Sequence, residues 1–176
     1  TYLSSVEKGL ALEAELAAFG VRAKGYRSDA SDFKAAEELV NAVVADFGTL
    51  DILVNNAGIS PAAPDTLPTA DWLEIWEKVV AVNTTAVGIL CKEFVDHARI
   101  QGDGRIVMIS SRAAFRGDTP DYMAYAASKG ALVSLMRSIA RHYGKEGIKA
   151  FLIAPGFTRT DMAAEILAQY GEDFAL

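Results

Sequence analysis

The segment L-D-I-L-V-N-N-A-G, Leu50 to Gly58, decides the fold, because an apolar run ends there in polar residues and a glycine. Leu50 to Val54 is apolar apart from Asp51, which is typical of a strand buried on both faces of a parallel sheet. Strand-like runs also occur at Arg105 to Ile109 and at Ile148 to Ile153. We therefore predict a parallel β-sheet that contains these three strands.

Helices are predicted between and before these strands. Apolar residues recur at spacings of three and four in four regions, approximately residues 4–20, 31–48, 71–99 and 120–144. The first region opens with a capping-box pattern, Ser4 to Glu7, has an apolar face along Leu10 to Ala18, and is expected to end at Gly20. Ser31 and Thr69 are the expected caps of the second and third helices.

A further short strand is expected at residues 21–27, with Val21, Ala23 and Tyr26 as its apolar members. Strands and helices then alternate along the chain, and right-handed crossovers would make the strands parallel, with helices on both faces. A chain of 176 residues with 51% hydrophobic content is sufficient for one domain with a core. We predict a single α/β domain, residues 1–176, with a doubly wound sheet of the Rossmann type.

The composition excludes several classes of partner. A net charge of -6 without a basic run argues against nucleic acid and anionic membranes. No uncharged apolar run of about 18 residues is present. The single Cys91 cannot form an internal disulfide, and His97 and His142 lie outside any cluster with metal-ligand spacing. We expect a cytoplasmic protein without a metal site.

The residues best suited to chemistry lie at the start of the last long helix. Tyr125 and Lys129 are four residues apart, so they share one helix face. An ammonium group beside a tyrosine favours the phenolate and lowers the tyrosine pKa from about 10, which makes the pair a tuned general acid. Ser111 follows the strand at residues 105–109, at the sheet edge where ligands bind, and its hydroxyl can hold a carbonyl oxygen.

A Tyr-x-x-x-Lys pair alone is weak evidence, because it arises by chance in roughly one chain in four of this composition. The other motifs that accompany the pair make the pattern specific. Asn55 to Gly58 follows one predicted strand, Pro155-Gly156 follows another, and Asn83 lies between them in the sequence. This set, in this order and over nearly the whole chain, resembles the short-chain dehydrogenase/reductase family. The chain departs from the family in one place, since Ser111 precedes Tyr125 by one residue more than is usual. This predicts a longer loop and leaves Ser110 as a weaker candidate.

The resemblance implies an NAD(P)-dependent oxidoreductase that moves a hydride between nicotinamide and a carbonyl or secondary alcohol. Tyr125 would give or take the proton, and Lys129 would hold the cofactor ribose and tune Tyr125. Ser111 would hold the substrate oxygen. Asn83 would complete a proton relay to the lysine.

The resemblance also implies a set of cofactor-binding residues. Asp29 and Ala30 would lie by the adenine ring, although an isolated Asp is as often a turn residue. The remaining set is Asn56, Ala57, Gly58, Pro155, Gly156, Thr158 and Thr160. No carboxylate precedes Glu7, where NAD enzymes of this fold carry one, so we expect NADP to be preferred, with NAD possible.

Substrate and assembly are implied more loosely. The runs I-L-V-N-N-A-G-I and A-P-G-F-T-R-T-D-M look most like 3-oxoacyl-[acyl-carrier-protein] reductases, which implies an acyl-thioester substrate. Sugar and secondary-alcohol dehydrogenases of the family share most of these residues, and a catalytically silent nucleotide-binding scaffold is the alternative from another class. The helices near residues 71–99 and 122–143 correspond to the family's subunit interfaces, so a homotetramer or dimer is expected.

Two elements of the family are not found in the sequence. The fingerprint G-x-G-x-x-G is absent, and the one G-x-G, Gly102 to Gly104, precedes a strand instead of following one. The substrate lid and final strand, expected after the helix at residues 163–170, are also absent. We therefore expect a sheet that is incomplete at both ends. We also expect that these 176 residues alone bind NADPH weakly and catalyse no turnover.

Overall fold

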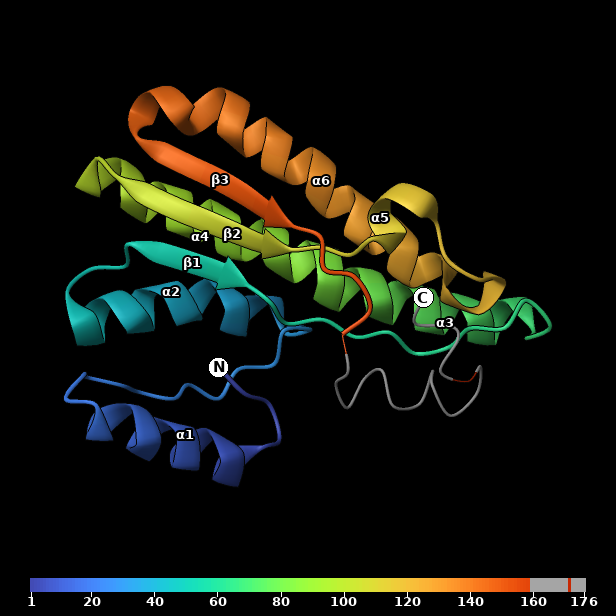
Figure 1. The fold of residues 1–176 in the computed structure, drawn as a ribbon, viewed down its shortest axis with the longest axis horizontal. Helices are drawn as coiled ribbons and strands as arrows, with labels where there is room; N and C mark the ends of the chain where they lie inside the picture. The colour runs from blue at the N-terminus through green and yellow to red at the C-terminus, as the bar shows by residue number, and fades with distance from the viewer. Residues whose placement is uncertain (159–170, 172–176) are drawn as a thin grey trace.

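The computed structural model describes residues 1–158 and residue 171, and its centre is a parallel β-sheet (Figure 1). The described strands, in their order across the sheet, are β1 (Ile52–Asn55), β2 (Gly104–Ile109) and β3 (Ile148–Ile153). Ile106 of β2 pairs with Leu53 of β1 on one side and with Ala150 of β3 on the other. The predicted parallel sheet is confirmed, with the three strands close to their predicted positions.

Helices connect the strands. The described α-helices are α1 (Val6–Ala18), α2 (Phe33–Phe47), α3 (Thr69–Val80), α4 (Ala86–Gln101), α5 (Ala113–Arg116) and α6 (Met123–Tyr143). Shorter turns are a π-helical turn (Ala81–Thr85) and the 3₁₀ turns Pro120–Tyr122 and Gly144–Glu146. The long helix predicted from residue 71 towards residue 99 is therefore present, but the π-helical turn divides it into α3 and α4. Such a turn often occurs at a functional site.

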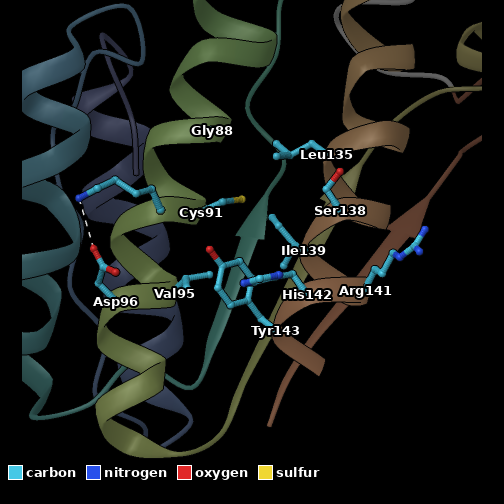
Figure 2. Close-up of a pocket in the computed structure, with 11 residues that line it drawn as sticks. Gly88, Cys91, Val95, Asp96, Leu135, Ser138, Ile139, Arg141, His142 and Tyr143 are labelled. Carbon is cyan, nitrogen blue, oxygen red and sulfur yellow. Dashed lines mark ion pairs between the residues drawn. The ribbon is translucent and has the colours of Figure 1, made fainter. Parts of the chain in front are cut away.

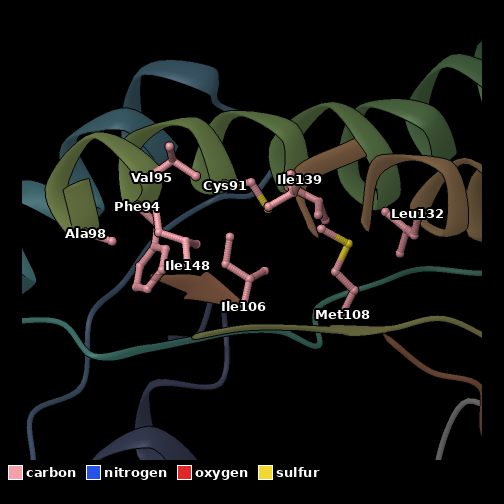
Figure 3. Close-up of a cluster of buried hydrophobic side chains, with 10 residues drawn as sticks. Cys91, Phe94, Val95, Ala98, Ile106, Met108, Leu132, Ile139 and Ile148 are labelled. Carbon is pink, nitrogen blue, oxygen red and sulfur yellow. The ribbon is translucent and has the colours of Figure 1, made fainter. Parts of the chain in front are cut away.

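The hydrophobic core lies between the sheet and helices α4 and α6, which cover the same face (Figure 3). Ile106 and Met108 of β2 are completely buried, and Phe94 of α4 and Leu132 of α6 belong to the same cluster. Burial alternates along β2, because successive side chains of a strand point to opposite faces. This packing fixes α4 and α6 relative to the ends of the strands.

The opposite face of the sheet is open among the described residues. Val54 of β1 and Phe151 of β3 are 55% and 49% exposed, and Ile52 and Ile153 on the same strands are similarly exposed. The prediction that Leu50 to Val54 is buried on both faces is therefore wrong for this part of the chain. The physical reason is that both helices that pack on the sheet lie on one side of it.

The N-terminal region differs most from its prediction. α1 has no buried residue, and Leu10 on its predicted apolar face is 56% exposed. Residues 21–27 do not form a strand: one isolated parallel bridge joins Tyr2 to Arg27, with Tyr2 N donating to the carbonyl oxygen of Tyr26 at 3.0 Å. A strand needs a neighbouring strand along its length, and the described chain supplies only the single bridged residue Tyr2.

The C-terminal ends of the helices were predicted more accurately than the N-terminal capping residues. Gly20 and Gly48 have φ of 78° and 84°, as expected for glycines that end a helix. Asp32, and not Ser31, caps α2 by accepting from Lys34 N at 3.0 Å and Ala35 N at 3.2 Å. The capping box expected from Ser4 to Glu7 does not form, because Ser5 precedes the first residue of α1 and makes no side-chain cap bond. Thr69, the other expected cap, is already the first residue of α3.

Candidate active site

The candidate site is located where the three parallel strands end. Ser110 follows β2, and its N–H donates to the carbonyl oxygen of Ile153 at the end of β3, at 2.8 Å. Arg112 N donates to the carbonyl oxygen of Pro155 at 3.2 Å. The segment after β2 is thus joined to the predicted nicotinamide segment after β3, as expected for the carboxyl edge of an open α/β sheet.

Lys129 is the charged group at the centre of this edge. It is 4% exposed, and its Nζ donates to the carbonyl oxygen of Ile109 at 3.0 Å. Burial lowers the pKa of its ammonium group, because the charged form loses hydration. Its Nζ lies 5.7 Å from the ring centre of Tyr125, so the predicted pair is close together.

Gly58 lies directly against Lys129. A β-carbon added at Gly58 would lie 3.1 Å from Lys129 Nζ and 3.3 Å from Asn83 Oδ1. The lack of a side chain at position 58 therefore lets the loop after β1 approach both polar groups. The structure brings together three of the predicted site residues, from the loop after β1, the π-helical turn and α6.

Asn83 is completely buried in the π-helical turn. Its Oδ1 accepts from Ile59 N at 2.8 Å, and its Nδ2 donates to the Ile59 carbonyl oxygen at 2.9 Å and to Ser128 Oγ at 3.0 Å. A buried amide with these three hydrogen bonds is well satisfied, so placing this polar residue in an apolar helix costs little free energy. Asn83 holds the loop after β1 against α6.

The two candidate serines have different surroundings. Ser110 is 3% exposed, and its Oγ donates to the carbonyl oxygen of Lys129 at 2.9 Å. Ser111 is half-buried, and its Oγ accepts from Ala113 N at 3.1 Å. The hydroxyl hydrogen of Ser111 can then serve as the donor to a ligand oxygen. This geometry favours Ser111 over Ser110 as the residue that holds the substrate oxygen.

The loop between Ser111 and Tyr125, predicted to be long, contains an element that the sequence did not indicate. This element is α5, a helix of four residues whose C-terminal neighbour, Gly117, has φ of 78°. The 3₁₀ turn at residues 120–122 follows and leads into α6, with Pro120 as its first residue. The helical region predicted at about residues 120–144 therefore begins at Pro120, as a 3₁₀ turn that continues into α6.

The remaining predicted cofactor residues are less enclosed. Asn56 and Ala57 are exposed and Ala30 is half-buried. Thr158 is exposed, and Thr160 lies outside the described residues. The cofactor roles of these residues stay predictions.

Asp29 holds a local turn. Its Oδ1 accepts from Ser31 N at 2.8 Å and from Ser31 Oγ at 2.7 Å. These two hydrogen bonds lower the pKa of the Asp29 carboxyl group. Of the two roles that the sequence allowed for Asp29, the structure shows the turn. The contact with the adenine ring stays a prediction.

A separate cavity of about 760 Å³ lies between α4 and α6 (Figure 2). It is lined by the C-terminal half of α6, from Leu135 to Tyr143, and by residues of α4 such as Val95 and Asp96. Tyr125 and Lys129 lie on the N-terminal half of α6 and do not line it. This cavity is therefore not the candidate active site.

The two histidines of residues 1–158 and 171 have structural surroundings. His97 Nε2 accepts from Leu50 N at 3.2 Å, and His142 packs edge-on against Tyr143. No group of three or more potential ligands is suited to a metal ion in this part of the chain. Among the same residues, no helix combines the length and apolarity that crossing a bilayer requires. The cytoplasmic location stays a prediction.

Comparison with known proteins gives the class of the protein. The family model described as short chain dehydrogenase matches residues 2–171. The chain therefore belongs to the short-chain dehydrogenase family, and the fold and the site geometry above agree with that class.

Particular relatives show how much of the family pattern the chain contains. It is 36% identical to a 2-dehydro-3-deoxy-D-gluconate 5-dehydrogenase of Pseudoalteromonas atlantica, over 88% of this chain and 59% of that protein. It is 31% identical to a 3-oxoacyl-[acyl-carrier-protein] reductase of Synechocystis, over 96% of this chain and 66% of that protein. A short chain dehydrogenase of Burkholderia cenocepacia, crystallised with NADP, is similar with a TM-score of 0.86 and 37% identity, over 96% of this chain and 67% of that one. The chain thus spans about three-fifths of its curated relatives' length.

Proposed function

We propose that the protein is an NAD(P)-dependent oxidoreductase that transfers a hydride between nicotinamide and a carbonyl carbon or secondary alcohol. The observation that carries the proposal is the convergence of Gly58, Asn83 and Lys129 beside Tyr125, at the carboxyl ends of β1 and β2. A buried ammonium next to a tyrosine is suited to proton transfer. A glycine that lets the loop after β1 lie against that ammonium places the loop backbone, proposed to line the ribose, beside Lys129.

Each residue has a distinct task in this proposal. The bound nicotinamide supplies or accepts the hydride. In the direction of reduction, Tyr125 donates its hydroxyl proton to the carbonyl oxygen while Ser111 Oγ donates a hydrogen bond to that oxygen. Lys129 would hold the ribose hydroxyls and favour the tyrosinate that forms.

Asn83 has a structural task that is visible directly. Its side-chain atoms bond the backbone of Ile59 and the hydroxyl of Ser128. In the proposal, Asn83 fixes the loop after β1 beside Lys129. A part for it in proton relay stays a prediction.

For the cofactor we propose NADP in preference to NAD. The absence of a carboxylate before Glu7 favours a 2′-phosphate, and the similar Burkholderia structure was crystallised with NADP. Measured kcat/KM with NADPH should exceed that with NADH by at least about tenfold. Comparable values would contradict the preference.

For the substrate we propose a 3-oxoacyl thioester. The similarity to the Synechocystis reductase supports it, and the similarity to the Pseudoalteromonas dehydrogenase supports a sugar acid as the second candidate. Consumption of NADPH by the full-length protein should be followed with acetoacetyl thioesters, 2-keto sugar acids and cyclic ketones in parallel. Turnover with one class identifies the substrate. No turnover with any class would favour the nucleotide-binding scaffold.

We also propose that the protein forms a homodimer or homotetramer through α4 and α6. The cavity between these helices is lined by the half-buried Leu135 and Tyr143. The Lys92–Asp96 ion pair of α4 and Arg141 of α6 also line it, so a two-fold copy brings charges of both signs together (Figure 2). Sedimentation at micromolar concentration should show a dimer or tetramer. Leu135→Asp should produce monomers, and a strictly monomeric wild type would contradict the proposal.

A further inference from the structure

Ser128 lies on α6 between Tyr125 and Lys129 and was not among the residues predicted for the site. It is 2% exposed, and its Oγ donates to the carbonyl oxygen of Tyr125 at 2.7 Å. A serine within a helix often makes such a bond to the preceding turn. Here the same oxygen also accepts from Asn83 Nδ2 at 3.0 Å, so the hydroxyl joins α6 to another element.

The connection continues beyond Asn83. The amide of Asn83 bonds both backbone groups of Ile59, in the loop after β1. A continuous chain of hydrogen bonds therefore runs from this loop, through the π-helical turn, to the turn of α6 that bears the catalytic tyrosine. Thr84 Oγ1 donates to the carbonyl oxygen of Ser128 at 3.4 Å and adds a weaker second link.

The groups joined by these hydrogen bonds are closely packed around Gly58, so α6 and the loop after β1 have little freedom to move relative to each other. Lys129 Nζ and Asn83 Oδ1 both lie close to the position that a β-carbon at Gly58 would occupy, at 3.1 and 3.3 Å. A shift of α6 relative to the loop would separate Lys129, proposed to hold the ribose, from the loop backbone proposed to line it. Misplacement of reacting groups by about 1 Å can reduce turnover about 10²-fold.

We infer that Ser128 is a positioning residue of the active site: its hydroxyl locks the turn of Tyr125 and Lys129 to Asn83 and to the cofactor-facing loop. The inference rests on the proposed function, because its effect is expressed in turnover. The Ser128 side chain is buried and its hydrogen bonds run to protein groups, so its proposed effect is indirect. It acts through Asn83 and the backbone of Tyr125.

The chain offers a matched control in the same helix. Ser138 Oγ donates to the carbonyl oxygen of Ser134 at 2.9 Å, so it makes the same type of bond to the preceding turn. Ser138 is exposed and lines the cavity between α4 and α6 that is proposed as the subunit interface, so sedimentation must show that Ser138→Ala keeps the wild-type oligomer. Its hydrogen-bond partner is in its own helix. Ser138→Ala therefore removes the local bond alone, whereas Ser128→Ala also removes the link to Asn83.

The experiment compares the steady-state kinetics of the full-length wild type, Ser128→Ala and Ser138→Ala well below their melting temperatures. We expect Ser128→Ala to lower kcat by about tenfold or more while substrate KM changes less than about threefold. Ser138→Ala should leave both within about twofold. If Ser128→Ala does not fold, Ser128→Cys supplies the same test, because it fills the space and weakens both hydrogen bonds.

The outcomes separate the two proposals. A wild type without turnover overturns the proposed function and this inference with it. An active wild type whose kcat is reduced no more by Ser128→Ala than by Ser138→Ala overturns the inference alone. A loss confined to KM also overturns it, because positioning of the reacting groups acts on kcat.

Discussion

The two faces of the β-sheet differ in what packs on them. On the face toward α4 and α6, Ile106 and Met108 are fully buried, whereas on the other face Val54 and Phe151 are about half exposed. Three of the candidate catalytic groups come from elements of the covered face, Asn83 from the π-helical turn before α4 and Tyr125 and Lys129 from α6, while Ser111 follows β2. The comparison teaches that the buried polar cluster is built by elements whose packing partners are present in the described chain.

The largest difference that we expect between the two faces is in how much a substitution lowers the free energy of unfolding. Met108→Ala should lower the free energy of unfolding by about 2–5 kcal/mol, because it opens a cavity in the core. Val54→Ala should cost less than about 1 kcal/mol, since the Val54 side chain is already half exposed. Chemical denaturation measures both. Equal losses in the full-length protein would show that a segment outside the described residues covers the open face.

The sequence predicted most of the elements around the core well and the N-terminal region, residues 1–27, poorly. The strand bounds at Ile148 and Ile153, the end of α2 at Gly48 and the neighbourhood of Tyr125 and Lys129 followed from periodicity, glycine placement and helical spacing. Each of these features depends on residues that are close in the sequence or on packing partners within the described chain, which is why the sequence pattern was sufficient to predict it.

The failures also have physical reasons. Residues 21–27 have strand periodicity, but a strand also needs neighbours along its length, which pattern cannot supply. Ser128 was missed because a serine in a helix is usually unremarkable. Its position directly before Lys129 in a small-residue segment was the one available signal. α5 was missed because its four residues are too few for periodicity to reveal.

The second prediction separates the two adjacent serines after β2. Ser111→Ala should reduce kcat about 10²-fold, because it removes a donor to the substrate oxygen. Ser110→Ala should act mainly on stability, by about 1 kcal/mol, because its Oγ bonds the backbone of Lys129. Turnover and thermal melting distinguish the two effects. A larger loss of kcat in Ser110→Ala would reverse the assignment.

The third prediction tests the close approach at the cofactor-facing loop. Gly58→Ala should lower kcat/KM about tenfold, because the added methyl group would press on Lys129 Nζ at 3.1 Å. Gly144→Ala is the control, since a β-carbon there meets no heavy atom within 4 Å. If both variants behave like the wild type, the loop does not need this contact.

The smallest expected effect is on the pH dependence of stability. Burial lowers the folded-state pKa of Lys129 below its unfolded value of about 10.4, so the unfolded state binds more protons between the two values. The free energy of unfolding should therefore rise with pH across that window. Lys129→Met should lack this contribution, and denaturation of both proteins from pH 7 to 10 would measure it. Parallel curves would contradict burial of a charged Lys129.

The central claim is that Tyr125 transfers the proton at this edge of the sheet, and its most direct test is the turnover of Tyr125→Phe. Tyr143→Phe is the matched control, since Tyr143 is a half-buried tyrosine near the other end of the same helix. With the substrate that the wild type reduces, Tyr125→Phe should lower kcat by about 10³-fold or more, with unchanged melting temperature. Tyr143→Phe should stay within a few-fold of the wild type. Activity of Tyr125→Phe within a few-fold of the wild type would contradict the assignment of the active site.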